Sequence, residues 1–385
     1  MKKIGLFLEA EPHFGGMFQY SQSILDALSF FPRKDYTVLV VYTKKDWVPH
    51  LKAYNFQTSY VRSSRPDELV AKVSRVFFLR AWRSVSQYVH PVLRKIRDEK
   101  CDLWIFPTQN VYSYQTNVPA LTAIHDLMHR YEKFPEITDP RQYASRERLF
   151  SNIVRYSKAI LVDSECGKRH VVESYAAHPD KIFALPYTVP KYISANQADC
   201  SVAETGLPPK YLFYPAQFWE HKNHPRLLRA LAEVKKAFPD VQLVLAGSKK
   251  NGYAAAVRLV DQLDLKNNVT YLGYVADQRM PGLYQNARAL VMPTFFGPTN
   301  IPPLEAFALG CPVAISGIYG MPEQCGDAAV YFDPLSVEDM AAVVRKIWSE
   351  DALCQLLAEK GWARSRSWQI PQFSQRLREI VEHVV

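Results

Sequence analysis

The chain reads LVMPTFFGPTNIPPLEAFALG from Leu290 to Gly310. The apolar run Leu290–Met292 is typical of a short buried strand, and a loop rich in proline follows it. Proline is tolerated in the first turn of a helix, so Pro302-Pro303 predicts a helix start with Glu305 inside that turn. With the apolar run Val313–Ile315 after the helix, the stretch predicts strand, loop, helix and strand in succession, which is the repeating unit of an α/β fold.

The same alternation of apolar runs and helix-length amphipathic segments extends along the whole chain. At about 150 residues per domain, the length of 385 residues predicts two domains. The polar stretch Lys191–Pro209 is the predicted linker between them. The predicted fold class is therefore α/β, with two doubly wound, Rossmann-like parallel sheets. The predicted strands are Lys3–Leu8, Thr37–Tyr42, Leu103–Pro107, Leu121–Ile124, Ala159–Val162 and Ile182–Leu185 in the first half, and Tyr211–Tyr214, Val241–Ala246, Val269–Leu272, Leu290–Met292, Val313–Ile315 and Val330–Phe332 in the second.

Composition excludes several classes of protein. Hydrophobic residues at 48% and charged residues at 22% exclude a disordered or low-complexity chain. No uncharged apolar run approaches the roughly 18 residues that span a bilayer, and Met1-Lys2-Lys3 leads into a predicted strand rather than a signal-peptide core. The six cysteines are scattered, which predicts neither a disulfide framework nor a zinc site. We therefore expect a cytoplasmic protein.

The positive charge is concentrated in one segment. The chain carries 47 Lys and Arg against 38 Asp and Glu, a net +9. Residues 61–100 hold ten basic and four acidic side chains, so 10 − 4 = +6 of this excess lies there. Apolar residues interleave with the charges and predict a basic amphipathic helix before Pro91. Such a helix either packs its apolar stripe on its own domain or lies on an anionic membrane surface; no nucleic-acid-binding motif accompanies it.

In the first half, two strand ends carry candidate site residues. Gly15 and Gly16 precede a predicted helix near Met17, where free amides would favour a phosphate or carboxylate. A plain tight turn is the alternative interpretation. His125 and Asp126 follow a buried strand, so His125 is placed to donate a hydrogen bond to a ligand with Asp126 orienting it. The alternative is a structural His–Asp pair.

In the second half, the candidates lie in two loops that follow strands. Lys222 comes just before a helix, where its ammonium and the helix dipole could act on one phosphate. An exposed, solvated lysine is the alternative. The Gly297–Ile301 loop would expose amides, and Glu305 could accept from a vicinal diol such as ribose. Alternatively, Glu305 is an acid that complements the helix dipole. Because parallel sheets bind ligands at the carboxyl ends of their strands, the predicted site is a cleft between the two domains.

Taken together, these segments resemble the family-four group of retaining nucleotide-sugar glycosyltransferases with the GT-B fold, in which two Rossmann-like domains face a cleft. The resemblance spans nearly the whole chain, and it is carried by the order of its motifs. These are the Gly15-Gly16 loop, the His125 strand end, Val162-Asp163-Ser164-Glu165, Lys222-Asn223, Leu245-Ala246-Gly247, Tyr271-Leu272-Gly273-Tyr274, Pro302-Pro303-Leu304-Glu305-Ala306 and Gly310-Cys311-Pro312-Val313.

The resemblance implies a role for each matching position. Lys222 would bind the donor diphosphate, and His125 would contact the donor sugar. These two are the predicted catalytic residues. The other predicted donor-binding residues are Gly15 and Gly16 near the phosphates, Gln217 at the position of a family arginine, Tyr274 and Val275 at the base, Thr299, Asn300 and Ile301 on sugar and phosphate, and Glu305 on the ribose hydroxyls.

The resemblance also implies a division of the chain. Residues 1–195 would form the acceptor-side domain and residues 205–365 the donor-binding domain. The second domain would end in a helix near Ser336–Trp362, and the helix predicted in residues 366–385 would cross back to the first domain.

Two positions depart from the family pattern. Gln217 stands where the family usually has an arginine, so one diphosphate contact is missing. Gly297 stands where the family usually has a glutamate that holds a donor-sugar hydroxyl. Backbone amides or Asn300 would have to take over that role. Because Lys222 and Glu305 are both present, we expect a variant subgroup rather than an inactive protein.

The implied activity is transfer of a hexose from a nucleoside diphosphate sugar to an acceptor hydroxyl with retention, in synthesis of a surface polysaccharide or lipopolysaccharide O-antigen. No metal and no further cofactor are expected. The expected partners are the donor, a glycan or lipid-linked acceptor and, through residues 61–100, the anionic inner face of the plasma membrane; no nucleic acid is expected. The alternatives are a GT-B nucleotide-sugar epimerase, a phosphorylase, and a non-catalytic nucleotide-sugar-binding protein.

Overall fold

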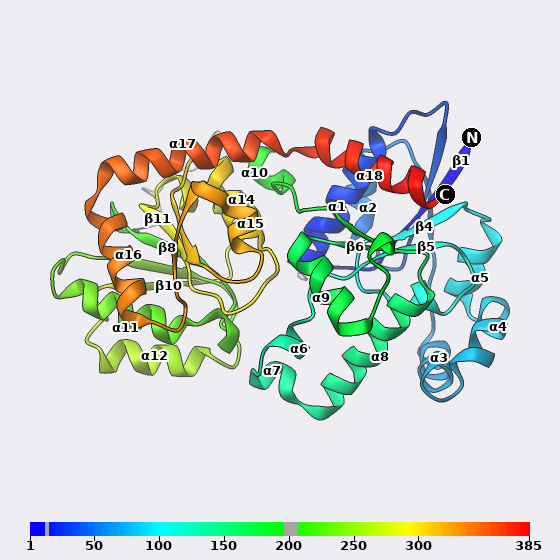
Figure 1. The fold of residues 1–385 in the computed structure, drawn as a ribbon, viewed down its shortest axis with the longest axis horizontal. Coiled ribbons are helices and arrows are strands. Elements are labelled where there is room, and N and C mark those ends of the chain that lie inside the picture. The colour runs from blue at the N-terminus through cyan, green and yellow to red at the C-terminus, as the bar shows by residue number, and fades with distance from the viewer. Residues whose placement is uncertain (12–14, 196–205) are drawn as a thin grey trace. The chain divides into compact units, whose positions relative to one another are not determined.

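The computed structural model describes residues 1–11, 15–195 and 206–385. The chain divides into two compact units, each built on one parallel sheet (Figure 1). Unit 1 comprises Met1–Leu127, Pro140–Tyr187 and Ile370–Val385. Unit 2 comprises Met128–Asp139 and Thr188–Gln369. Residues 128–139 and the last sixteen residues therefore depart from a simple division of the chain near residue 195.

Unit 1 has a seven-stranded sheet in the order β3-β2-β1-β4-β5-β6-β7, with every neighbouring pair parallel. Its strands are β1 (Lys2–Leu8), β2 (Tyr36–Tyr42), β3 (Gln57–Tyr60), β4 (Leu103–Phe106), β5 (Ala120–Ala123), β6 (Ala159–Val162) and β7 (Ile182–Ala184). The six strands predicted in this half are all present. The sequence did not predict β3, because an edge strand that pairs only with β2 and is mostly exposed needs no apolar run.

The helices of unit 1 cover this sheet, and the last one comes from the end of the chain. They are α1 (Gly16–Ser29), α2 (Trp47–Leu51), α3 (Arg65–Phe77), α4 (Leu79–Val89), α5 (Pro91–Asp98), α8 (Pro140–Tyr156), α9 (Glu165–Tyr175) and α18 (Ile370–Val384). Helix α18 packs on α1, where the Ser374 hydroxyl donates to the Ala27 carbonyl at 2.7 Å. Its apolar face, which includes Phe373 and Leu377, is fully buried.

The basic segment forms three helices, so the prediction of a single helix before Pro91 is wrong. Ser64 caps α3 through a reciprocal pair of hydrogen bonds with Asp67. Phe78 then leaves helical geometry, with φ −135° and ψ 36°, and separates α3 from α4. Helix α5 begins at Pro91 and buries Val92, Leu93 and Ile96.

Unit 2 has a six-stranded parallel sheet in the order β10-β9-β8-β11-β12-β13. Its strands are β8 (Leu212–Pro215), β9 (Leu243–Ala246), β10 (Val269–Gly273), β11 (Ala289–Met292), β12 (Val313–Ser316) and β13 (Ala329–Phe332). All six correspond to predicted strands, which confirms the α/β class with two Rossmann-like sheets. The helices are α6 (Met128–Tyr131), α7 (Pro135–Thr138), α10 (Lys191–Ala195), α11 (His224–Lys235), α12 (Tyr253–Gln262), α13 (Met280–Gln285), α14 (Ile301–Ala308), α15 (Met321–Cys325), α16 (Val337–Ser349) and α17 (Asp351–Ser367).

Two predicted segments of unit 2 differ in the structure. The first five residues of the predicted linker Lys191–Pro209 form α10, which packs on α14, while residues 196–205 lie outside the described part of the chain. The helix predicted near Ser336–Trp362 is two helices, because Glu350 adopts an extended conformation between α16 and α17. Within the described residues, none of the helices has the length and apolar character needed to cross a membrane.

Candidate functional site

The unit 2 sheet reverses its strand order between β8 and β11. From β8 the chain moves outward to β9 and β10, whereas from β11 it moves the other way to β12 and β13. Ligands of doubly wound sheets bind outside the carboxyl ends of the strands at such a switch point. The loops that follow these two strands, residues 216–223 and 293–300, contain Gln217, Lys222, Thr299 and Asn300. The topology therefore brings the two predicted loops to one edge of the sheet.

Direct hydrogen bonds join the two loops. The Phe295 amide donates to the His221 carbonyl at 2.9 Å. Asn223 adopts the left-handed conformation, with φ 60°, and its buried side-chain amide donates to the carbonyls of Pro293 and Pro334, both at 2.9 Å. The Tyr214 hydroxyl donates to the Lys222 carbonyl at 3.0 Å. Lys222, at the end of a short 3-10 turn, is therefore attached on both sides to the strand ends of the switch point.

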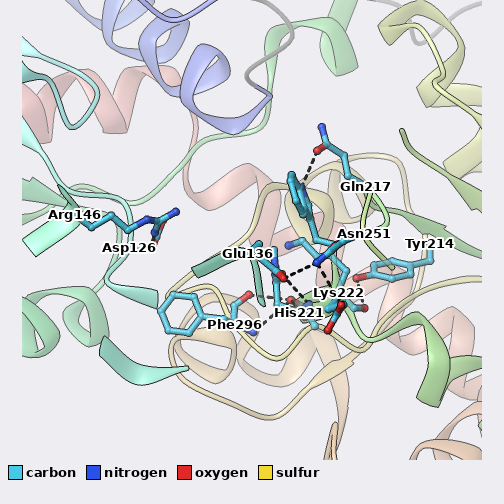
Figure 2. A network of polar contacts seen from close by, with 12 residues as sticks. Asp126, Glu136, Arg146, Tyr214, Gln217, His221, Lys222, Asn251 and Phe296 are labelled. Atoms are coloured by element: carbon cyan, nitrogen blue, oxygen red, sulfur yellow. Dashed lines mark hydrogen bonds and ion pairs between the residues drawn. The ribbon is translucent and has the colours of Figure 1, made fainter. Parts of the chain in front are cut away.

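A carboxylate from the first half of the sequence reinforces this loop (Figure 2). Glu136 of α7 accepts hydrogen bonds from the His221 ring at 2.5 Å and from the Asn251 amide at 3.0 Å. Burial opposes ionisation of Glu136, but these hydrogen bonds outweigh it and lower the pKa of its carboxyl to about 2. Phe134 stacks on Phe295 at 5.4 Å between ring centroids. Residues 128–139 thus pack against both loops of the unit 2 switch point.

The second loop is built around Gly297. Its φ of 142° is rarely adopted by residues with a side chain, and a Cβ there would lie 2.3 Å from Nδ2 of Asn300. The side chain of Gln324 holds the loop by accepting from the Asn300 amide at 2.9 Å and donating to its carbonyl at 2.6 Å. The main-chain amide of Asn300, which we expected to face a ligand, is therefore occupied by Gln324 in this conformation.

Glu305 lies on α14 but not in its first turn. The helix begins at Ile301, and Asn300 is its N-cap. Glu305 is therefore in the second turn, which corrects the predicted helix start and argues against a simple dipole-complementing role. Its buried carboxylate accepts from the hydroxyls of Tyr192 and Tyr284, the latter at 2.6 Å. Burial raises the pKa of Glu305, while the two tyrosine hydroxyls act in the opposite direction.

The remaining predicted residues of unit 2 differ in exposure. Gln217 is exposed, and its side-chain oxygen accepts from the Trp219 indole at 3.0 Å. Tyr274 is 75% exposed, whereas the neighbouring Val275 packs against the core of unit 2. Thr299 is buried and Ile301 is half-buried.

Unit 1 has its own switch point between β1 and β4. Gly15, with φ 57°, is the N-cap of α1, and Gly16 is its first helical residue; both are exposed. Residues 12–14 of the same loop lie outside the described residues. Glu9, directly after β1, accepts from the side-chain amide of Asn110 at 2.5 Å, and burial raises the pKa of its carboxyl.

His125 is held on both sides of its ring. Its Nε2 lies 2.9 Å from the Pro107 carbonyl, and the Tyr187 hydroxyl lies 2.9 Å from its Nδ1. Burial lowers the pKa of His125 to about 4, so the neutral ring donates to Pro107 and accepts from Tyr187. Asp126, which we expected to orient the ring, instead lies 3.6 Å from the Arg146 guanidinium (Figure 2). In this conformation the His125 ring has no free donor for a ligand.

Several site residues carried no recognisable signal in the sequence. Glu136, Tyr192, Tyr284 and Gln324 each contact a predicted residue or its loop from an element distant in sequence. Of the site residues that the sequence analysis missed, only Glu9 had a usable signal, which is its position directly after strand β1. Among the described residues, His, Cys, Asp and Glu side chains form no group of three that could hold a metal ion.

Comparison with known proteins identifies relatives of both the sequence and the fold. Residues 202–364 match the model of the family described as glycosyl transferases group 1. The chain is 26% identical over 280 residues to O-antigen chain mannosyltransferase B of Escherichia coli, covering 69% of this chain and 71% of that protein. It is 26% identical over 200 residues to O-antigen chain mannosyltransferase RfbU of Salmonella typhimurium, covering 52% and 53%.

Solved structures of similar proteins cover the whole chain. HepE of Anabaena, in complex with UDP and glucose, has a TM-score of 0.73 at 16% identity over 100% of both chains. WaaG, a glycosyltransferase involved in lipopolysaccharide biosynthesis, has a TM-score of 0.66 at 17% identity over 98% of this chain and 99% of that one. These similarities show the two-domain GT-B fold.

Proposed function

We propose that this glycosyltransferase moves a hexose from a nucleoside diphosphate sugar to a glycan acceptor with retention of anomeric configuration, since residues 202–364 match the model of the glycosyl transferases group 1 family. Mannose is the first sugar to test, since two of its relatives are named O-antigen chain mannosyltransferases. The same names support a growing O-antigen or a related lipopolysaccharide glycan as the acceptor.

The observation that carries the proposal is the junction of the Lys222 loop with the loop after β11. Breaking a glycosidic bond to a diphosphate leaves negative charge on the phosphate oxygens, which must be stabilised in the transition state. The Lys222 ammonium, at a sheet switch point, is suited to that task. The hydrogen bonds through His221 and Asn223 place the two loops together before any ligand binds, so little reorganisation is required.

The sequence of the second loop bears on the stereochemical course. It contains no Asp or Glu between Pro293 and Leu304, so it offers no carboxylate as a covalent nucleophile. We therefore propose attack of the acceptor hydroxyl on the same face that the diphosphate leaves, with a phosphate oxygen accepting the hydroxyl proton. The bond from the anomeric carbon to the diphosphate breaks, the bond to the acceptor oxygen forms, and the proton leaves with the diphosphate. No divalent cation is proposed to take part, and turnover unchanged by a chelator would support this point.

The first experiment is a thermal-shift screen of mannose and glucose donors that carry uridine or guanosine diphosphate. Selective stabilisation by one donor identifies the sugar and base. Transfer is then measured with that donor and O-antigen fragments, with product configuration determined by NMR. Release of epimerised sugar without acceptor, or a requirement for free phosphate, would instead indicate the epimerase or phosphorylase alternative.

The Lys222→Ala variant tests the mechanism. We expect kcat to fall by about 10²-fold or more, since a charge-stabilising group at the leaving diphosphate is lost. The fold should be retained, because Lys222 holds its neighbours through its backbone carbonyl. Lys236→Ala, at an exposed position on the same unit, is the matched control. Near-normal turnover of Lys222→Ala would remove this residue from the mechanism, and donor binding without turnover in the unsubstituted protein would indicate a binding protein.

A further inference from the structure

Helices α3 and α4 expose an unusual number of large apolar side chains. We call this surface the α3–α4 patch. It consists of Leu69, Val70, Val73, Phe77, Phe78, Val85, Tyr88 and Val89, all exposed. Phe77 and Phe78, at the break between the helices, are 71% and 68% exposed. Large apolar side chains exposed in such number on two consecutive helices commonly mark an interaction site.

The two helices are attached to unit 1 through other side chains. Helix α3 buries Ala71 and is tied down by Glu68, which accepts from the Tyr112 hydroxyl at 2.5 Å. Helix α4 buries Trp82 and Ser86, which donate to the side chain and the main-chain carbonyl of Gln115 at 2.6 and 2.7 Å.

At 100° per residue, Leu69, Val73 and Phe77 share one face of α3, about 160° from Ala71. The apolar stripe of α3 therefore points away from the unit that the helix packs on. Of the two sequence-based alternatives, packing of this stripe on its own domain does not apply to α3.

The charge around the patch is positive. Arg62, Arg65, Lys72 and Arg80 are exposed, and none of these four forms an ion pair within the described part of the chain. The two nearby acids are engaged locally, since Asp67 binds Ser64 at the helix cap and Glu68 binds Tyr112. The free charge beside the apolar side chains is thus cationic.

We propose that the α3–α4 patch docks on an anionic lipid bilayer, with Phe77 and Phe78 entering the headgroup region and the four free cations contacting lipid phosphates. Apolar and aromatic side chains flanked by Lys and Arg are the combination that binds such an interface. Tyr88, with the Arg97 guanidinium 4.4 Å from its ring centroid, adds an amphipathic pair of the kind found at headgroup depth. The proposed membrane-binding surface includes α3 and α4 but not all of residues 61–100, because α5 buries its apolar side chains in unit 1.

The proposal is independent of the donor and the reaction, so vesicle binding tests it directly. The full chain is sedimented with phosphatidylcholine vesicles containing 30% phosphatidylglycerol, at about 50 mM and 500 mM salt. We expect binding that weakens at least tenfold at the higher salt and is at least tenfold weaker on pure phosphatidylcholine. Phe77→Ser/Phe78→Ser should weaken binding at least tenfold, and Lys72→Gln/Arg80→Gln by about fivefold for each charge removed.

Matched controls are taken from unit 2. Leu335→Ser removes an exposed apolar side chain, and Lys236→Gln/Lys266→Gln removes two exposed charges; both should bind like the unsubstituted protein. Circular dichroism confirms that the patch variants fold, which we expect because the substituted residues are exposed. Equal binding to neutral and anionic vesicles, or unchanged binding of Phe77→Ser/Phe78→Ser, would overturn the proposal. So would a dimer in analytical ultracentrifugation that the same variant dissociates, because the patch would then be an interface between copies.

Discussion

At the scale of the single residue, Gly297 shows how one position constrains a whole loop. The family-like glutamate cannot be restored there without rearrangement, since the backbone has φ 142° and the space for a Cβ is filled by Asn300. The departure from the family pattern is therefore part of the loop's conformation and not an isolated loss of a carboxylate. Whatever holds the donor sugar here must come from main-chain groups or from neighbouring side chains.

Gly297→Ala should consequently destabilise unit 2 by about 1–3 kcal/mol, from backbone strain and the contact with Asn300. Chemical denaturation measures the change. Adding Asn300→Gly should recover only part of the loss, because it removes the contact but leaves the strained φ. Gly310→Ala is a suitable comparison, since Gly310 has φ 68° but no atom within 4 Å of its Cβ position. A Gly297→Ala protein no less stable than Gly310→Ala would contradict this account.

His224 makes stability depend on pH. It is buried at the start of α11 and stacks on Phe218 at 4.3 Å between ring centroids, and its Nε2 has no partner. Burial, followed by the charges of Lys222 and His221, lowers the pKa of His224 from 6.5 to about 3. A histidine whose pKa is lower in the folded state than in the unfolded state contributes its full stabilisation at pH values above the unfolded pKa. That contribution is lost as the pH falls from 6.5 towards 3.

Between pH 7 and pH 5, this one histidine should cost about 2 kcal/mol of unfolding free energy. His224→Gln should therefore lose about that much less over the same interval, as measured by urea denaturation at each pH. His178→Gln, at an exposed position, is the matched control for the substitution. Parallel pH profiles for His224→Gln and the unsubstituted protein would show that His224 is not responsible.

At the scale of secondary-structure elements, the sequence predicted the buried strands well, but it did not predict short helices that depend on tertiary contacts. Buried parallel strands such as β6 and β9 are continuous apolar runs, and these are visible in one sequence. Helix α10 was missed because five residues in a polar stretch have no periodicity to detect. Helix α10 makes a tertiary contact, the hydrogen bond of Tyr192 to Glu305, and local sequence cannot reveal such a contact.

The hydrogen bond between Tyr192 of α10 and Glu305 of α14 leads to a testable prediction. The proposed ribose ligand and Tyr192 would compete for the same carboxylate, so Tyr192→Phe should strengthen donor binding by about fivefold, the value of one hydrogen bond. Isothermal titration calorimetry with the donor found in the thermal-shift screen measures the effect. Tyr284→Phe serves as the comparison, because it removes the other hydroxyl on Glu305 and leaves α10 in place. Weaker donor binding in Tyr192→Phe would show that Tyr192 positions Glu305 instead of competing for it.

At the scale of the whole molecule, chain order and spatial order differ in two places. Residues 128–139 pack in unit 2 although unit 1 lies on both sides of them in the sequence, and they supply Glu136 to the Lys222 loop. Residues 370–385 pack in unit 1 after the whole of unit 2. Hydrophobic patterning shows that these segments are structured, but it does not show which core they join. The resemblance to GT-B enzymes suggested the second exchange, and nothing in the sequence suggested the first.

The return of α18 makes the stability of unit 1 depend on the end of the chain. Phe373 and Leu377 are fully buried, so Phe373→Ala and Leu377→Ala should each cost about 2–5 kcal/mol. Hydrogen exchange followed by mass spectrometry should then show lost protection in residues 1–127 and 140–187, while residues 206–369 keep theirs. Arg376→Gln, which removes an exposed ion pair on the same helix, should change neither region. Equal loss of protection in both units would mean that they unfold together, because a helix that supports only the core of unit 1 can destabilise only that core.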